Sequence, residues 1–144
     1  MARISLYNII FGFAVIFFAA IYGALLALDT TDTLVHAPID MLRWEQTLSR
    51  SAHGHTNLFG ILHICFGLTF PFSILSVRTK TIQSIFLACG TFAMGPLMIL
   101  RAKFGLPIGT DYLGGIIGLF LSLTLASLLV HTVGLAMKTF KRTV

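Results

Sequence analysis

The chain has 144 residues, of which 56% are hydrophobic and only 10% are charged, and its mean hydropathy is +0.91. A soluble domain carries roughly 25% charged residues, so the composition excludes an ordinary soluble protein and predicts one integral membrane domain over residues 1–144. The formal net charge is +5, but the basic residues lie at the ends of apolar segments. This placement is typical of membrane orientation, so we expect a lipid bilayer as the surroundings and no nucleic-acid partner.

Four apolar segments have about the length that a helix needs to cross a bilayer, roughly 20 residues. We expect these spans near residues 6–28, 51–77, 82–100 and 112–137. The first is too long for the apolar part of an ordinary signal peptide, so we expect a retained anchor helix. The predicted fold is therefore all-α, a four-transmembrane-helix bundle in a multi-pass membrane protein. Pro71 and Pro96 are each expected to kink a helix.

The longest polar connection covers residues 29–49. After Pro38 it predicts a short helix on the membrane surface, with Trp44 at the depth of the lipid headgroups. If both termini lie on one side, that side carries basic residues and no acidic ones: Arg3, Arg78, Lys80, Lys138, Lys141 and Arg142. All the acidic residues fall on the other side: Asp29, Asp32, Asp40, Glu45 and Asp111. This asymmetry predicts that both termini are cytoplasmic, and we expect the inner (plasma) membrane of a bacterial-type cell.

Residues 50–72 form the most informative segment, because they carry the histidines His53, His55 and His63 within an apolar span. Ionisable side chains inside a membrane are costly and indicate function, and imidazoles are common ligands of metals and haem iron. We therefore expect the second span to be the ligand-bearing helix of a small membrane haemoprotein. Arg50, next to the histidines, is the first choice for a contact with a haem propionate.

Helical spacing separates the roles of these histidines. His53 and His55 are two residues apart and point to roughly opposite sides of a helix, so we expect one ligand, His53, and one hydrogen-bonding neighbour, His55. His63 lies about 15 Å deeper than His53. A haem held between His63 and His131 is geometrically awkward.

One face of the same helix carries Thr56, Gly60, His63 and Gly67. Glycines on this face indicate either close packing of two helices or a flat macrocycle lying against the helix. The sequence leaves both interpretations open, and in the second Gly60 and His63 would contact the cofactor.

The run Arg50-Ser-Ala-His53-Gly-His-Thr-Asn-Leu-Phe-Gly60 resembles the second-helix motif of the styrene oxide isomerases, which are four-helix membrane proteins. In that family a histidine seven residues before a glycine binds haem b. The resemblance implies that His53 is the axial ligand of the haem b iron and that Gly109-Thr-Asp111 matches the family's Gly-x-Asp. It further implies a homotrimer with haem near the subunit interfaces. It also implies an isomerase in which ferric haem acts as a Lewis acid on a small hydrophobic epoxide.

The chain departs from the family at three positions. Phe59 stands where the family has asparagine, and Cys89 and Leu97 fall where the family has aspartate and tyrosine. These departures are compatible with haem binding, but they count against epoxide isomerisation.

Three classes of function follow. In the first, a haem enzyme, Asn57, Asp111 or Tyr112 would orient the substrate or transfer a proton. The second is an electron-transfer or quinone-reactive cytochrome b, which needs two axial ligands. The third is a non-haem accessory or transport protein, in which the histidines are only hydrogen-bonded between helices. We favour a homo-oligomer, because four short helices bury little surface around a large cofactor.

Overall fold

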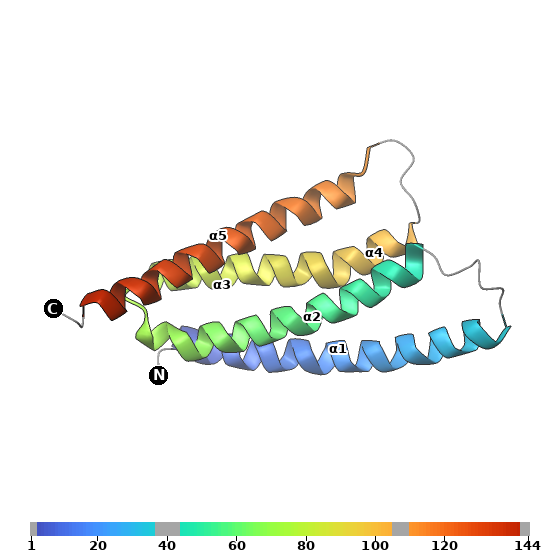
Figure 1. Ribbon diagram of the computed structural model, residues 1–144, viewed down its shortest axis with the longest axis horizontal. Helices are drawn as coiled ribbons and strands as arrows, with labels where there is room; N and C mark the ends of the chain where they lie inside the picture. Colours follow the sequence, from blue (N-terminus) through green and yellow to red (C-terminus); the bar gives the residue numbers. More distant parts are fainter. Residues whose placement is uncertain (1–2, 37–43, 105–109, 142–144) are drawn as a thin grey trace.

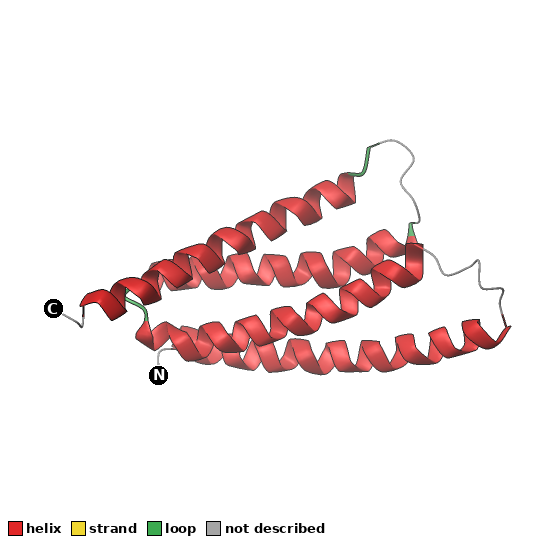
Figure 2. Ribbon diagram, in the orientation of Figure 1, coloured by secondary structure: helices red, strands yellow, loops and turns green. Residues whose placement is uncertain are grey.

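The computed structural model describes residues 3–36, 44–104 and 110–141, and these residues contain helices and turns without any strand (Figure 2). The elements in chain order are α1 (Arg3–His36), α2 (Trp44–Thr69), a 3-10 turn (Phe70–Phe72), α3 (Val77–Phe92), a π-helical turn (Ala93–Leu97), α4 (Met98–Lys103) and α5 (Tyr112–Lys141). The all-α prediction is confirmed.

The helices form four rods that alternate in direction, with α3 and α4 continuing each other through the π-helical turn (Figure 1). α1 lies along α2, α2 packs on the α3–α4 rod, and α5 packs on α3 and diverges from α4 toward its own first residues (Figure 1). We call the end with the start of α1, the 3-10 turn and the end of α5 the basic end. The opposite end, with the starts of α2 and α5, is the acidic end.

Three helical segments of the described chain are long and apolar enough to cross a membrane: Arg3–Asp29, Val77–Lys103 and Tyr112–Phe140. Their mean hydropathies are 2.6, 1.7 and 2.3, which supports an integral membrane protein. α2 has 26 residues and lies between α1 and the α3–α4 rod, but its histidines and Arg50 make it less apolar. The composition of α2 alone does not identify it as a membrane span. Its place between apolar helices is the only indication that it could be a fourth span.

Two predicted boundaries of the second span are wrong. Trp44 and the four residues after it form the first turns of α2, so they are no part of a separate surface helix; residues 37–43 lie outside the described residues. α2 ends at Thr69 rather than at residue 77, because Pro71 begins a 3-10 turn instead of kinking a continuing helix. Pro96, in contrast, lies inside the π-helical turn, where the altered hydrogen-bond pattern accommodates the missing N–H.

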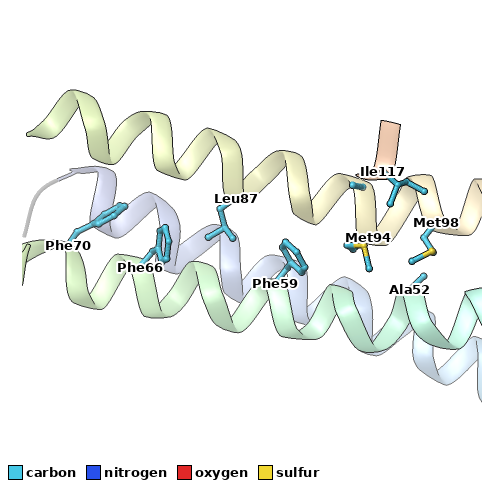
Figure 3. Close-up of a cluster of buried hydrophobic side chains, with 9 residues drawn as sticks. Ala52, Phe59, Phe66, Phe70, Leu87, Met94, Met98 and Ile117 are labelled. Atoms are coloured by element: carbon cyan, nitrogen blue, oxygen red, sulfur yellow. The ribbon is translucent and has the colours of Figure 1, made fainter. Parts of the chain in front are cut away.

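The apolar core runs along the middle of the bundle between α2, the α3–α4 rod and the start of α5. Figure 3 shows the aromatic rings of α2 pointing toward Leu87 on α3, with the two methionines nearer the acidic end. The buried members are Ala52, Phe59, Phe66, Phe70, Leu87, Ala93, Met94, Met98 and Ile117.

A second contact, between α1 and α2, depends on glycines, over which isoleucines of the opposite helix pack. A Cβ added to Gly12 would lie 2.5 Å from the Gly60 backbone oxygen, and one on Gly67 would lie 2.5 Å from the Ser5 backbone oxygen. The two backbones therefore approach closely, as small residues allow in membranes. The glycine face of α2 packs against α1, and this is the first of the two interpretations that the sequence left open.

Gly12→Ala tests this contact. The added methyl group would meet backbone atoms of α2, so we expect the free energy of unfolding to fall by about 1–3 kcal/mol. Gly115→Ala is the matched control, since a Cβ there meets no atom within 4 Å and alanine favours helix. Thermal unfolding of the purified protein in detergent measures both, and equal effects would contradict the close approach of α1 and α2.

Candidate functional site

His53 lies half-buried in the seam between α1 and α2. Its Nδ1 is 3.0 Å from the backbone oxygen of Ala19. Because a carbonyl oxygen only accepts, Nδ1 must carry the proton, and this leaves the lone pair on Nε2. The ring lies directly over Gly23, where a Cβ would overlap its atoms. The seam can hold an imidazole at this position only because residue 23 has no side chain.

The neighbours of His53 on α2 take different roles. Asn57 donates its amide to the His53 backbone oxygen at 3.1 Å, and the same amide nitrogen is 3.5 Å from each ring nitrogen of His53. His55 points elsewhere, with Nδ1 2.8 Å from the backbone oxygen and 3.2 Å from the hydroxyl of Ser51. The two rings therefore point to different sides of α2, and each places Nδ1 against a backbone carbonyl.

A cavity of about 360 Å³ adjoins the His53 position at the acidic end. Arg50, one turn before His53, contributes the charged part of its lining. The rest comes from α1: Gly23, Leu26, Ala27 and Thr31. Gly23 thus contacts the His53 ring on one side and lines the cavity on the other. The cavity itself has a mostly apolar wall with one cationic side chain, and the His53 imidazole lies against Gly23 outside this lining.

His63 has a different environment, the buried junction of α1, α2 and α3. Asn8 donates its amide to the Ile4 backbone oxygen (2.9 Å) and to the Ser84 hydroxyl (2.7 Å). The Asn8 side-chain oxygen therefore accepts, and His63 Nδ1 donates to it at 2.9 Å. His63 Nε2 is 3.2 Å from the Thr91 hydroxyl oxygen. Both ring nitrogens are occupied by side chains of the bundle, so none is free for a metal.

Beside this network a second cavity, of about 230 Å³, lies between α1 and α3. The largest side chains of its wall are Tyr7 and Phe11 on α1 and Ile85 on α3. Phe11 packs edge-on against the His63 ring, with 4.6 Å between ring centroids. Since the polar groups behind it are hydrogen-bonded to one another, this cavity offers mainly an apolar wall.

His131 lies on α5, near the basic end, and is buried. Its Nε2 is 2.7 Å from the Thr69 hydroxyl oxygen, and its ring stacks on Phe66 with centroids 4.3 Å apart. Its Nδ1 has no hydrogen-bond partner among the described residues. Both ring nitrogens of His63 are hydrogen-bonded within the bundle, whereas His131 uses one of its two.

Asp111 and Tyr112, the other candidate catalytic residues, lie at the start of α5. Asp111 accepts a hydrogen bond from the Gly114 N–H at 2.8 Å and forms an ion pair with Arg101. The guanidinium carbon of Arg101 lies 4.8 Å from the ring centroid of Trp44. Asp111 is therefore the N-terminal cap of α5 and joins it to α4 and α2. Tyr112 is 76% exposed.

The structure brings together Arg50, His53 and Asn57, which share two turns of α2 against α1. It does not bring Asp111 to them within one chain, because that carboxylate is held by Arg101 on the α4 side. Sequence reasoning missed Asn8 and Thr91 as the partners of His63. An asparagine within the first apolar span was the available signal, since a buried polar group in a membrane needs a partner.

No group of three or more histidine, cysteine, aspartate or glutamate side chains that could hold a metal ion occurs within residues 3–36, 44–104 and 110–141. A metal that needs several protein ligands is therefore not suited to this part of the chain. Haem iron needs only one or two, because the porphyrin supplies four nitrogens. The donor set fits haem better than a bare metal ion.

Asn8→Ala tests the His63 network. The substitution leaves the His63 Nδ1–H without its acceptor, so we expect the free energy of unfolding to fall by about 1–3 kcal/mol. Thr132→Ala is the control, since its exposed hydroxyl bonds only to the Leu128 backbone oxygen of its own helix. Thermal unfolding in detergent compares the two variants, and an unaffected Asn8→Ala protein would contradict the buried network.

The Asp111 cap predicts a dependence of stability on pH. The hydrogen bond from Arg101, followed by that from Gly114, lowers the pKa of Asp111 below its ordinary value of 3.8. A carboxyl whose pKa is lower in the folded state stabilises it above pH 3.8, and this contribution is lost as the pH falls through the lower folded value. Asp111→Asn should therefore unfold more easily at neutral pH and lose less stability than the wild type on acidification.

Melting temperatures across this pH range test the prediction. Glu45→Gln is the control, because the carboxylate of Glu45 is exposed and 3.6 Å from Lys103, where an ion pair contributes little. Parallel pH profiles of the wild type and Asp111→Asn would show that the cap is not formed.

Comparison of the chain with protein-family models, with curated proteins and with solved structures finds no match. The resemblance of residues 50–60 to the styrene oxide isomerases therefore rests on the sequence motif alone.

Proposed function

We propose that this chain is a four-span membrane protein whose α2 binds haem b, with His53 as the one axial ligand that the chain supplies. The observation that carries the proposal is the 3.0 Å contact of His53 Nδ1 with the Ala19 backbone oxygen. A histidine that ligates a metal usually donates its other N–H to a carbonyl or carboxylate, which orients the ring and makes the ligating nitrogen more basic. His53 has that arrangement, and so does His55, through the Ser51 backbone oxygen; the motif at residues 50–60 singles out His53. In His63, by contrast, both ring nitrogens are taken by side chains.

The surroundings of His53 suit a haem in two further respects. The adjoining cavity has an apolar wall from α1 for the macrocycle, and the exposed Arg50 at its rim can pair with a propionate. Asn57, whose amide lies 3.5 Å from the imidazole nitrogens, is placed to hold the ring or to orient a ligand beside it. Gly60 faces α1, so its role is to let α1 approach rather than to contact the cofactor.

A single chain supplies only one wall of such a site. The cavity beside Arg50 is lined by one face each of α1 and α2, and on α5 a Cβ at Gly115 or Gly118 would meet no atom within 4 Å. A homo-oligomer, a trimer by the resemblance, would bring a second surface against the haem. We place the chain in the plasma membrane of a bacterial-type cell. The charge distribution favours an orientation with both termini inside the cell.

Bound ferric haem would supply a Lewis acid for a small hydrophobic epoxide, and this finer assignment comes from the resemblance. The role of this chain would be to hold the imidazole on one face and leave the other face open. His63 has both ring nitrogens hydrogen-bonded, His55 points to the other side of α2, and His131 lies near the basic end. None of these three therefore faces His53 across a haem within one chain. This favours the five-coordinate enzyme over the bis-histidine cytochrome. Asp111 and Tyr112 could act only if another subunit brings them to the haem.

The absorption spectrum of the protein purified with haem present tests the proposal. We expect a Soret band of the five-coordinate ferric type in the wild type, and its loss in His53→Ala. His55→Ala is the matched control, two residues away on the other side of the helix, and should keep the band. Retention of haem by His53→Ala would refute the ligand assignment, and a colourless wild type would refute haem binding.

A further inference from the structure

Two lysines from different helices meet at the 3-10 turn of the basic end. Lys80, in the first turn of α3, donates from Nζ to the backbone oxygen of Ser73 at 3.2 Å. Lys138, near the end of α5, donates from Nζ to the backbone oxygen of Pro71 at 3.1 Å. Because Pro71 and Ser73 are two residues apart, the two ammonium groups are held close together, and the charge of Lys138 acts on Lys80.

The described part of the chain provides no carboxylate for this pair. The ion pairs found among the described residues, Arg101 with Asp111 and Lys103 with Glu45, both lie at the acidic end. Every aspartate and glutamate of the sequence lies between residues 29 and 45 or at residue 111. Each ammonium has three N–H donors, and the turn carbonyls take one from each lysine. Two like charges with spare donors are therefore held together, and an anion between them would relieve their repulsion.

The position of the pair indicates which anion this is. The apolar segments Val77–Lys103 and Tyr112–Phe140 begin and end here, so the ammonium groups lie where a bilayer places its phosphates. Large apolar side chains stand exposed around them: Phe72 is 63%, Val77 67% and Phe140 75% exposed. A phosphate on the lysines with acyl chains along these side chains matches a lipid better than a free ion.

We propose that Lys80, Lys138 and the 3-10 turn form a binding site for the phosphate of an anionic phospholipid. The site lies at the opposite end of the bundle from His53 and is independent of haem. The proposal rests on two lysines that one turn holds at fixed positions. It goes beyond the positive-inside pattern, which describes only on which side of the membrane the basic residues lie.

Phosphatidylglycerol titrated into the detergent-purified, lipid-depleted protein tests the site, with bound lipid counted by native mass spectrometry. We expect binding to weaken about 30-fold in the double variant Lys80→Gln/Lys138→Gln, which corresponds to about 1 kcal/mol for each lysine. Lys138→Gln alone, whose side chain is the more exposed of the two, should weaken it about fivefold and serves if the double variant does not fold.

Three controls make the result specific. Lys103→Gln removes a lysine at the acidic end, and Lys80→Arg/Lys138→Arg keeps both charges; each should bind the lipid as the wild type does. Phosphatidylcholine, which has no net charge, should bind more weakly than phosphatidylglycerol. Undiminished binding in the double glutamine variant would overturn the proposal. Displacement of the lipid by inorganic phosphate at the same concentration would show that a free anion, and not a lipid, is the ligand.

Discussion

The close contact of α1 with α2 is the constraint on which the rest of this bundle depends. Gly12, Gly60 and Gly67 bring the two backbones together along the basic half of the seam, and Gly23 continues the small-residue surface toward the acidic end. Ile9, Ile16 and Ile64 pack over these glycines, so the two helices are held by close packing of backbone and side chains, which is how helices associate in an environment as apolar as their side chains. Both histidines discussed as ligands take their surroundings from this contact.

The same contact gives His53 and His63 opposite characters. At the depth of His63, α1 presents the Asn8 side chain, and Thr91 of α3 approaches from the other side, so both nitrogens are satisfied. At the position of His53, α1 presents a glycine and a backbone carbonyl that accepts from Nδ1, and Nε2 has only a long contact of 3.5 Å with the Asn57 amide. A saturated buried histidine stabilises the bundle, whereas a half-buried one with a directed lone pair can bind a ligand.

The two ends of the bundle differ in how they treat charge. At the acidic end, Arg101 is paired with Asp111 and stacked near Trp44, so it joins three helices. At the basic end, Lys80 and Lys138 donate to carbonyls of one turn without a carboxylate among the described residues. At the acidic end the cation has its carboxylate within the chain. At the basic end each ammonium group has one carbonyl contact and N–H donors to spare. We therefore interpret the first as a structural cap and propose the second as a binding surface.

The sequence by itself determined the helical class, because hydropathy and length are local properties that need no partner. Of the four spans it predicted, three coincide with described helices that are long and apolar enough to cross a membrane. It also determined that charges divide between the two ends, and that His53 and His55 point to different sides, since helical spacing requires it. It placed the second span at residues 51–77, whereas α2 begins seven residues earlier and ends eight residues earlier. The end was missed because Pro71 is compatible with either a kink or an ending.

Only the tertiary structure decided what each polar side chain does. The partners of His63 come from residues far away in the chain, and the carbonyl that orients His53 belongs to α1, so no spacing within α2 could reveal them. The sequence offered Asp111 only as a residue that orients a substrate or transfers a proton, and its role as a cap became visible when α4 placed Arg101 beside it. The glycines of α2 were likewise ambiguous, because a glycine leaves space for either a helix or a ligand. The structure shows that α1 occupies this space.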